Sequence, residues 1–268
     1  FESVTTICDK KFYNPLIKEL TKNNGETSLA FRKKMAERNF KLTSDYDLSI
    51  FKWFNGKTRK EKNIKIKIKY GENPNQRAYY LANTKQNLFS SQLNGKKLGY
   101  NNILDISEGL ICLNEFSEPT CVIIKHNNPC GVASAKNIHN AYLKALQSDF
   151  KSAFGGIVLF NRKIEKNLAK LLIKNFYEVV VSPKFSQEIL QMLRLKKNLI
   201  IIDSSNLNEK TNKIYKTVKS GVLCQEFNSY KILKSEIKLV SKKKSSDKIL
   251  NDLIFAYKVA KHVKSNAV

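Results

Sequence analysis

The sequence lacks the features of several common protein classes. Its five Cys are an odd number without a close pair, which argues against a disulfide framework and favours reduced thiols. No apolar stretch approaches the roughly 18 residues that a membrane-spanning helix needs, and no apolar block follows a charged start as in a secretion signal. We therefore expect a cytoplasmic protein with no membrane partner.

Acidic residues are also scarce, with 23 Asp and Glu against 48 Lys and Arg, for a formal net charge of +25. Such an excess favours polyanions, above all nucleic acid. Only 6 of the 48 basic residues are Arg, however, and proteins that read bases and phosphates rely on the bidentate Arg fork. Solvated lysines explain most of the charge, so we expect no specific nucleic-acid partner. A polyanion-binding module remains an alternative hypothesis.

The apolar fraction of 42% over 268 residues predicts a well-packed core in one large or two ordinary domains. Near the start, Val4–Cys8 predicts a strand, and Asn14-Pro15 predicts the first turn of a short helix. Thr27 and Ser44 are candidate N-caps of a second and a third helix. These elements are too few to close a core by themselves.

The polar stretch Asn55–Lys62 predicts a domain boundary. After it, Ile64–Ile68 alternates with Lys, a period of two that predicts a strand with one buried face. Apolar residues at helical spacing over 138–146 predict a helix, and the apolar runs 157–160 and 179–181 predict buried strands. Strands alternating with helices predict an α/β sandwich.

The most informative stretch is an apolar run, Cys121–Ile124, that leads into Lys125 and His126 and then into Asn128–Gly131, which we expect to form a turn opened by its glycine. Ligand sites in α/β proteins gather where such strands end. A neutral imidazole can accept a proton from a weakly nucleophilic amine, and an adjacent ammonium can stabilise a developing oxyanion. The Lys-His pair therefore predicts catalysis, although a lone His is often only a polar residue that closes a strand.

Cys130 invites two other interpretations, a zinc ligand or a thiol nucleophile. The zinc motif of nucleoside deaminases needs a second Cys three positions later, where the chain has Ala133, and a His-x-Glu upstream. A nucleophilic Cys needs a base held by an orienting group, which the sequence does not offer. We expect no metal site and an ordinary turn cysteine.

Further candidates are weaker. The turn Ser152–Gly156 can bring backbone amides close to a planar heterocycle, although paired glycines are also typical of a tight turn. Lys69, Lys196 and Lys197 are candidate phosphate contacts, yet any single lysine in so basic a chain is most often solvated.

Together, five blocks closely resemble, in order and spacing, the bifunctional purine-biosynthesis family of AICAR transformylase/IMP cyclohydrolase. These blocks are Lys69–Gln76, Tyr100–Asp105, Lys125–Gly131, Ser152–Gly156 and Lys261–Ala267. The resemblance covers essentially the whole chain. It implies that residues 1–57 are the end of the cyclohydrolase domain and 58–268 the first half of the transformylase domain, so that the chain is a fragment.

The resemblance implies a folate-dependent formyltransferase. The enzyme would transfer a formyl group from 10-formyltetrahydrofolate to AICAR, giving FAICAR, which the cyclohydrolase domain closes to IMP. The resemblance implies that His126 assists amine deprotonation, that Lys125 supports the tetrahedral intermediate, and that Asn266 binds the formyl group. It also implies nucleotide contacts by Tyr70, Asn101, Phe154 and Gly155.

The resemblance further implies a cytidine-deaminase-like fold without its zinc and a homodimer with active sites at the subunit interface. Because those sites use residues absent from this chain, an inactive structural piece of the enzyme is a second alternative. The sequence departs from the family at Lys69, where Arg is common, and at Gly99, where Ser is usual. A lysine offers a point charge in place of a bidentate fork, so we expect weaker nucleotide binding.

Overall fold

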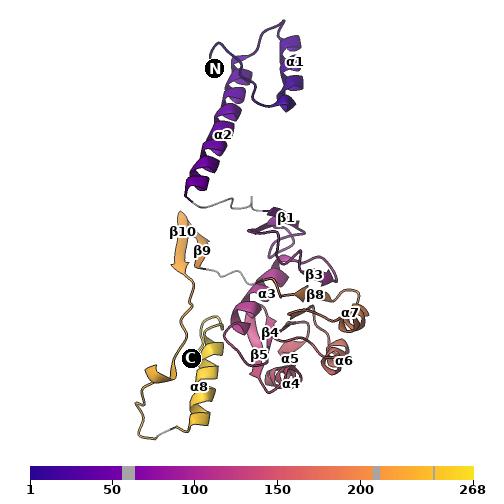
Figure 1. Ribbon diagram of the computed structural model, residues 1–268, viewed down its shortest axis with the longest axis vertical. Helices are drawn as coiled ribbons and strands as arrows, with labels where there is room; N and C mark the ends of the chain where they lie inside the picture. The colour runs from indigo at the N-terminus through magenta and orange to yellow at the C-terminus, as the bar shows by residue number, and fades with distance from the viewer. Residues whose placement is uncertain (56–63, 208–211, 244) are drawn as a thin grey trace. The chain divides into compact units, whose positions relative to one another are not determined.

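The computed structural model describes residues 1–55, 64–207, 212–243 and 245–268 (Figure 1). The chain divides into two compact units, Phe1–Asn63 and Ile64–Val268, and each is considered by itself. All of the predicted boundary Asn55–Lys62 except Asn55 lies outside the described residues. No helix within the described ranges is long and apolar enough to span a membrane.

The first unit is helical. A short 3-10 turn, Lys10–Phe12, leads into α1 (Tyr13–Lys22), and α2 (Leu29–Phe54) follows. The prediction of a strand at Val4–Cys8 was wrong, because the segment pairs with no other strand. The prediction of two further helices was also wrong. Ser28 rather than Thr27 caps α2, with its Oγ accepting from Phe31 N at 3.3 Å, and no Gly or Pro interrupts the helix at Ser44.

The second unit is built on a six-stranded mixed sheet with the order β3-β8-β7-β6-β4-β5, next to a separate hairpin of β1 and β2. Strands β6, β7 and β8 run parallel, whereas β3, β4 and β5 pair antiparallel with their neighbours. The strands of the hairpin and the sheet are β1 (Ile64–Ile68), β2 (Ala78–Ala82), β3 (Gln92–Asn94), β4 (Thr120–Lys125), β5 (Asn128–Ser134), β6 (Ile157–Phe160), β7 (Val179–Ser182) and β8 (Ile200–Asp203). A mixed α/β fold is therefore confirmed.

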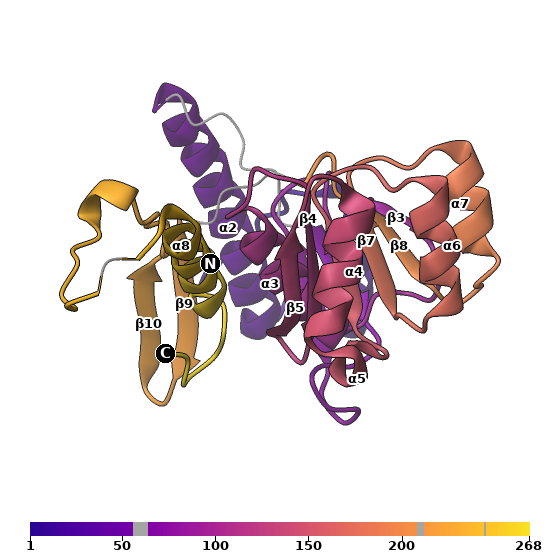
Figure 2. The same ribbon diagram turned by 90° about the horizontal axis from the view of Figure 1, so that it is seen from below.

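Helices cover both faces of this sheet, so its central strands are buried on both sides (Figure 2). On one face, Val158 and Val180 pack with α4 (Ile138–Ser148), α6 (Lys166–Lys174) and α7 (Gln187–Arg194). On the other face, Leu159 and Val181 pack with α3 (Tyr100–Leu113). Successive residues of β6 and β7 therefore point alternately into the two cores.

The remaining elements are α5 (Phe150–Ala153), the exposed hairpin of β9 (Lys213–Val218) and β10 (Gly221–Glu226), a 3-10 turn at Lys234–Glu236, and α8 (Asp247–Ala260). Ser246 caps α8, with its Oγ accepting from Ile249 N. Phe255 and Val259, one helical turn apart, pack against the core that contains α3. The ring centroids of Phe255 and Phe116 are 5.0 Å apart.

Candidate active site at the β4–β5 turn

Lys125 and His126 lie where β4 reverses into β5. Lys125 pairs with Asn128, which leaves a loop of only His126 and Asn127. Both loop residues have positive φ, 53° and 59°, as a type I′ hairpin turn requires. Asparagine tolerates this conformation, whereas a histidine pays a steric cost of about 1–2 kcal/mol. The strain therefore lies at the residue predicted to be catalytic.

The prediction that Asn128–Gly131 forms the turn was wrong, because these residues belong to β5. Gly131 is needed for helix packing instead: a Cβ there would lie 2.1 Å from the carbonyl oxygen of Ala145 in α4. Cys130 is half-buried in the same strand, and burial raises the pKa of its thiol above the ordinary value of 9.0. A raised pKa disfavours the nucleophilic thiolate.

A cavity of about 460 Å³ opens beside the turn, a volume within the roughly 300–1,000 Å³ typical of small-molecule sites. It lies where β4 ends and where β6 and β7 begin, with the N-terminus of α3 as a further wall. Six of the predicted site residues line it: Tyr70, Asn101, Lys125, His126, Phe154 and Gly155. The sequence blocks that contain them are thus brought together from four separate segments.

The side chain of Lys125 contacts the segment just before β6. Its Nζ donates a hydrogen bond to the carbonyl oxygen of Phe154 at 2.6 Å. The next residue, Gly155, has a φ of 71°, and its N–H donates to the carbonyl oxygen of Phe176 at 2.9 Å. A glycine at this position lets the chain turn sharply after Phe154, whose ring stays mostly exposed beside that of Phe176.

The structure adds Asp105 as a site residue that the sequence analysis gave no role. Asp105 lies one helical turn after Asn101, so both side chains of α3 face the cavity. Its Oδ1 accepts a hydrogen bond from the backbone N–H of Asn127 at 2.7 Å. Burial raises the pKa of the Asp105 carboxyl above its ordinary value of 3.8, although the Asn127 hydrogen bond and the nearby His126 and Lys264 act in the opposite direction.

A second group missed by the sequence analysis surrounds Glu178, just before β7. Its Oε2 accepts from Asn102 Nδ2 at 3.0 Å and lies 3.3 Å from Lys96 Nζ. Glu178 and Lys96 line both the main cavity and a neighbouring one of about 260 Å³. Asn102 belongs to the block Tyr100–Asp105, whereas Lys96 and Glu178 have no distinctive motif and meet Asn102 only in the folded chain.

Four predicted candidates do not line the main cavity. Lys196 and Lys197 line the neighbouring cavity. Lys69 lies beside Tyr70, with its Nζ 5.6 Å from the centre of that ring. Asn266 lies near the C-terminal end of the described chain, two residues after Lys264, whose N–H donates to Asn128 Oδ1 at 2.9 Å.

The N-terminus of α3 contributes partial positive charge to a cavity that Asp105, Glu178, Lys96 and Lys125 also line. Backbone N–H groups in the first turn of a helix lack intrahelical partners, and the helix dipole adds partial positive charge there. Asn101 and Tyr100 in this turn line the cavity together with Lys125. The described residues contain no cluster of three His, Cys, Asp or Glu that could hold a metal ion. The site thus combines anion-binding groups with an imidazole and an ammonium.

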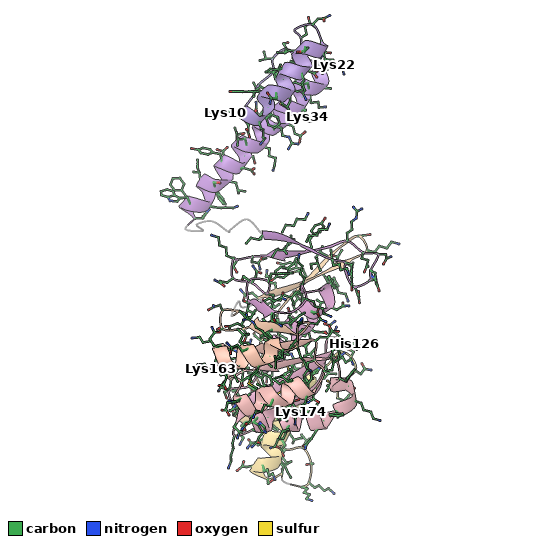
Figure 3. The ribbon with its side chains drawn as sticks, turned by 90° about the vertical axis from the view of Figure 1, so that its right-hand side faces the viewer. Lys10, Lys22, Lys34, His126, Lys163 and Lys174 are labelled. Atoms are coloured by element: carbon green, nitrogen blue, oxygen red, sulfur yellow. The ribbon has the colours of Figure 1, made fainter. Side chains whose placement is uncertain are left out.

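The labelled lysines in Figure 3 come from both units, and in that view Lys163 and His126 lie on opposite sides of the second unit. Lysine is therefore not confined to the face that carries the cavity. This distribution fits solvated lysines better than a single surface for a polyanion.

Comparison with known proteins gives consistent matches over the whole chain. The family described as the AICARFT/IMPCHase bienzyme matches residues 1–268. Proteins named bifunctional purine biosynthesis protein PurH are similar: that of Caldicellulosiruptor bescii is 43% identical over 286 residues, and that of Clostridium beijerinckii is 40% identical over 280. Each alignment covers 100% of this chain and 55% of the relative, so the chain spans about half the length of these curated relatives.

Among solved structures, RibD of Acinetobacter baumannii is a distant match. It is 18% identical, with a TM-score of 0.28, and the match covers 38% of this chain and 33% of that one. A likeness at this level supports no conclusion about function.

Proposed function

Because the chain belongs to the AICARFT/IMPCHase bienzyme family, we propose that its second unit carries part of the site that formylates AICAR. In this proposal residues 58–268 are the first half of the transformylase domain, with a deaminase-like fold, and residues 1–57 are the end of the cyclohydrolase domain. The formyl donor is 10-formyltetrahydrofolate. The observation that carries the proposal is the position of Lys125 and His126 together on a cavity of nucleotide size.

The nucleotide would occupy the main cavity. Its phosphate is an anion, and the N–H groups at the start of α3 offer the partial positive charge that an anion needs. Phe154 and Tyr70 offer aromatic faces for the imidazole ring of AICAR. Lys69 and Lys197 lie just outside the cavity, where a change of rotamer could bring their flexible side chains toward the phosphate.

The chemistry would use His126 as the general base. The 5-amino group of AICAR is a weak nucleophile, and His126 would accept its proton as the new bond forms between nitrogen and the formyl carbon. The electron pair of the formyl carbonyl moves onto its oxygen, and Lys125 would stabilise this oxyanion. When the bond to N10 of the folate breaks, the proton passes to N10 and tetrahydrofolate leaves.

Asn266 has a proposed part in binding the formyl group. The hydrogen bond from Lys264 N–H to Asn128 Oδ1 supports this role, because it ties the segment before Asn266 to the first residue after the catalytic turn. We also propose that the active enzyme is a homodimer. Its sites would be completed by residues outside this chain, because the chain spans only 55% of the length of its relatives.

The test is an assay of a protein of the relatives' full length that carries this sequence. We expect tetrahydrofolate to form only when both AICAR and 10-formyltetrahydrofolate are present. Residues 1–268 alone should bind AICAR in calorimetry without turnover. A full-length protein that is folded but neither binds AICAR nor releases tetrahydrofolate would contradict the proposal.

A further inference from the structure

The turn that carries His126 needs an external partner. A two-residue hairpin turn with positive φ at both positions is usually built from Asn-Gly or Gly-Gly. Here the residues are His126 and Asn127, with φ of 53° and 59°. A bulky side chain in this conformation persists only when neighbouring groups hold it there.

Asp105 reaches the turn from outside the hairpin. It lies in α3, 22 residues before Asn127 in the sequence, and its Oδ1 accepts the Asn127 N–H at 2.7 Å. A carboxyl oxygen can accept this hydrogen bond whether or not the group is ionised. Asp105 forms no salt bridge among the described residues, so its carboxylate is not neutralised by a cation in direct contact.

The scaffold around Asp105 is rigid. Ile103 and Ile106, on either side of it in α3, are buried in the core beneath the sheet. That core also contains Ile124, the residue just before Lys125. The helix and the end of β4 are therefore fixed to each other, and Asp105 transmits this fixed position to the turn.

We propose that Asp105 is a positioning residue for the formyl transfer. The hydrogen bond that Asp105 accepts from Asn127 N–H holds the turn in its left-handed conformation. The turn then orients the His126 imidazole toward the cavity. The inference rests on the proposed function and adds a residue to its machinery. An error of about 1 Å in the position of a catalytic group can cost on the order of a hundredfold in rate.

The chain offers a matched control in Asp203. Its Oδ1 accepts from the N–H of Lys184 at 3.2 Å, and Lys184 also has a positive φ, 58°. Asp203 and Lys184 thus make the same kind of contact, a carboxyl oxygen accepting the N–H of a residue with positive φ. Neither of them lines the main cavity. Loss of either Asp should affect stability, but only loss of Asp105 should affect His126.

The experiment measures kcat, KM and melting temperature for Asp105→Ala, Asp105→Asn and Asp203→Ala in the full-length enzyme. We expect kcat of Asp105→Ala to fall about 10- to 100-fold with KM for AICAR within about threefold of wild type. Asp105→Asn keeps an oxygen acceptor for Asn127 N–H, so its kcat should recover to within about fivefold. Asp203→Ala should keep wild-type kcat.

Two results would overturn the inference. The first is an Asp105→Ala enzyme with kcat within about twofold of wild type, while His126→Ala is impaired, which leaves the proposed function standing. The second is an Asp105→Asn enzyme as slow as Asp105→Ala, which means that the hydrogen bond to the turn is not what matters. If His126→Ala also keeps full activity, the proposed function itself fails.

Discussion

Lys125 donates a hydrogen bond from its ammonium group to the carbonyl oxygen of Phe154 at 2.6 Å, which joins the end of β4 to the turn before β6. The two strands are antiparallel neighbours, and Ile124 pairs with Ile157. The hydrogen bond therefore ties a cation to the Phe154–Gly155 turn, and these residues line the same cavity as His126.

We predict that Lys125→Met lowers kcat about 100- to 1,000-fold, because the cation that stabilises the oxyanion is lost. Steady-state release of tetrahydrofolate measures the effect. Lys136→Met is the matched control, because Lys136 is an exposed lysine two residues after β5. A Lys125→Met enzyme as fast as this control would exclude Lys125 from the chemistry.

Gly131→Ala should destabilise the fold by about 1–3 kcal/mol, because its Cβ would collide with the carbonyl oxygen of Ala145 and force α4 away from β5. Chemical denaturation measures the free energy of unfolding. Gly221→Ala should be nearly neutral, since nothing lies within 4 Å of a Cβ there. Equal stabilities of the two variants would show that the close approach of α4 is unimportant.

Asp105→Asn should change how stability depends on pH. Because the folded-state pKa of Asp105 is raised above 3.8, the folded protein favours the protonated carboxyl. The contribution of Asp105 to the stability of the wild type is fully present below pH 3.8. This contribution is lost as the pH rises through the raised folded-state pKa of Asp105. The melting temperature of the wild type relative to Asp105→Asn should therefore fall on going from acid to neutral pH. The opposite trend would mean that the ionised form is the favoured one.

Lys69→Arg should lower the KM for AICAR by about three- to tenfold and leave kcat unchanged, because a guanidinium can bind phosphate through two parallel hydrogen bonds. Initial rates at varied AICAR concentration test this expectation. An unchanged KM would indicate that residue 69 stays beside Tyr70, where the structure places it, and never reaches the nucleotide.

Local patterns were sufficient to predict much of the fold. The alternation in Ile64–Ile68 corresponds to β1, and the apolar runs near 157 and 179 correspond to β6 and β7. These segments are short, and burial on one or both faces leaves a direct trace in the residue order. The prediction failed at Ser44, where a possible cap lies inside the uninterrupted helix α2.

The site could be predicted only in part, because some of its contacts form only through tertiary packing. Asn128–Gly131 has the composition of a turn, yet it pairs with β4 as a strand, and Gly131 packs closely against Ala145 of α4. That contact depends on tertiary packing, which local composition does not encode. Asp105 was missed likewise, because its partner Asn127 is 22 residues away in the sequence and meets it only when α3 covers the sheet.

The role of His126 as general base is tested by the rate of AICAR formylation in a full-length His126→Ala enzyme at saturating substrates. We predict a loss of kcat by about two to four powers of ten, with AICAR binding retained in calorimetry, because His126 removes the amine proton without holding the phosphate. Turnover equal to wild type would contradict the central claim that this imidazole, on its strained turn, drives the transfer.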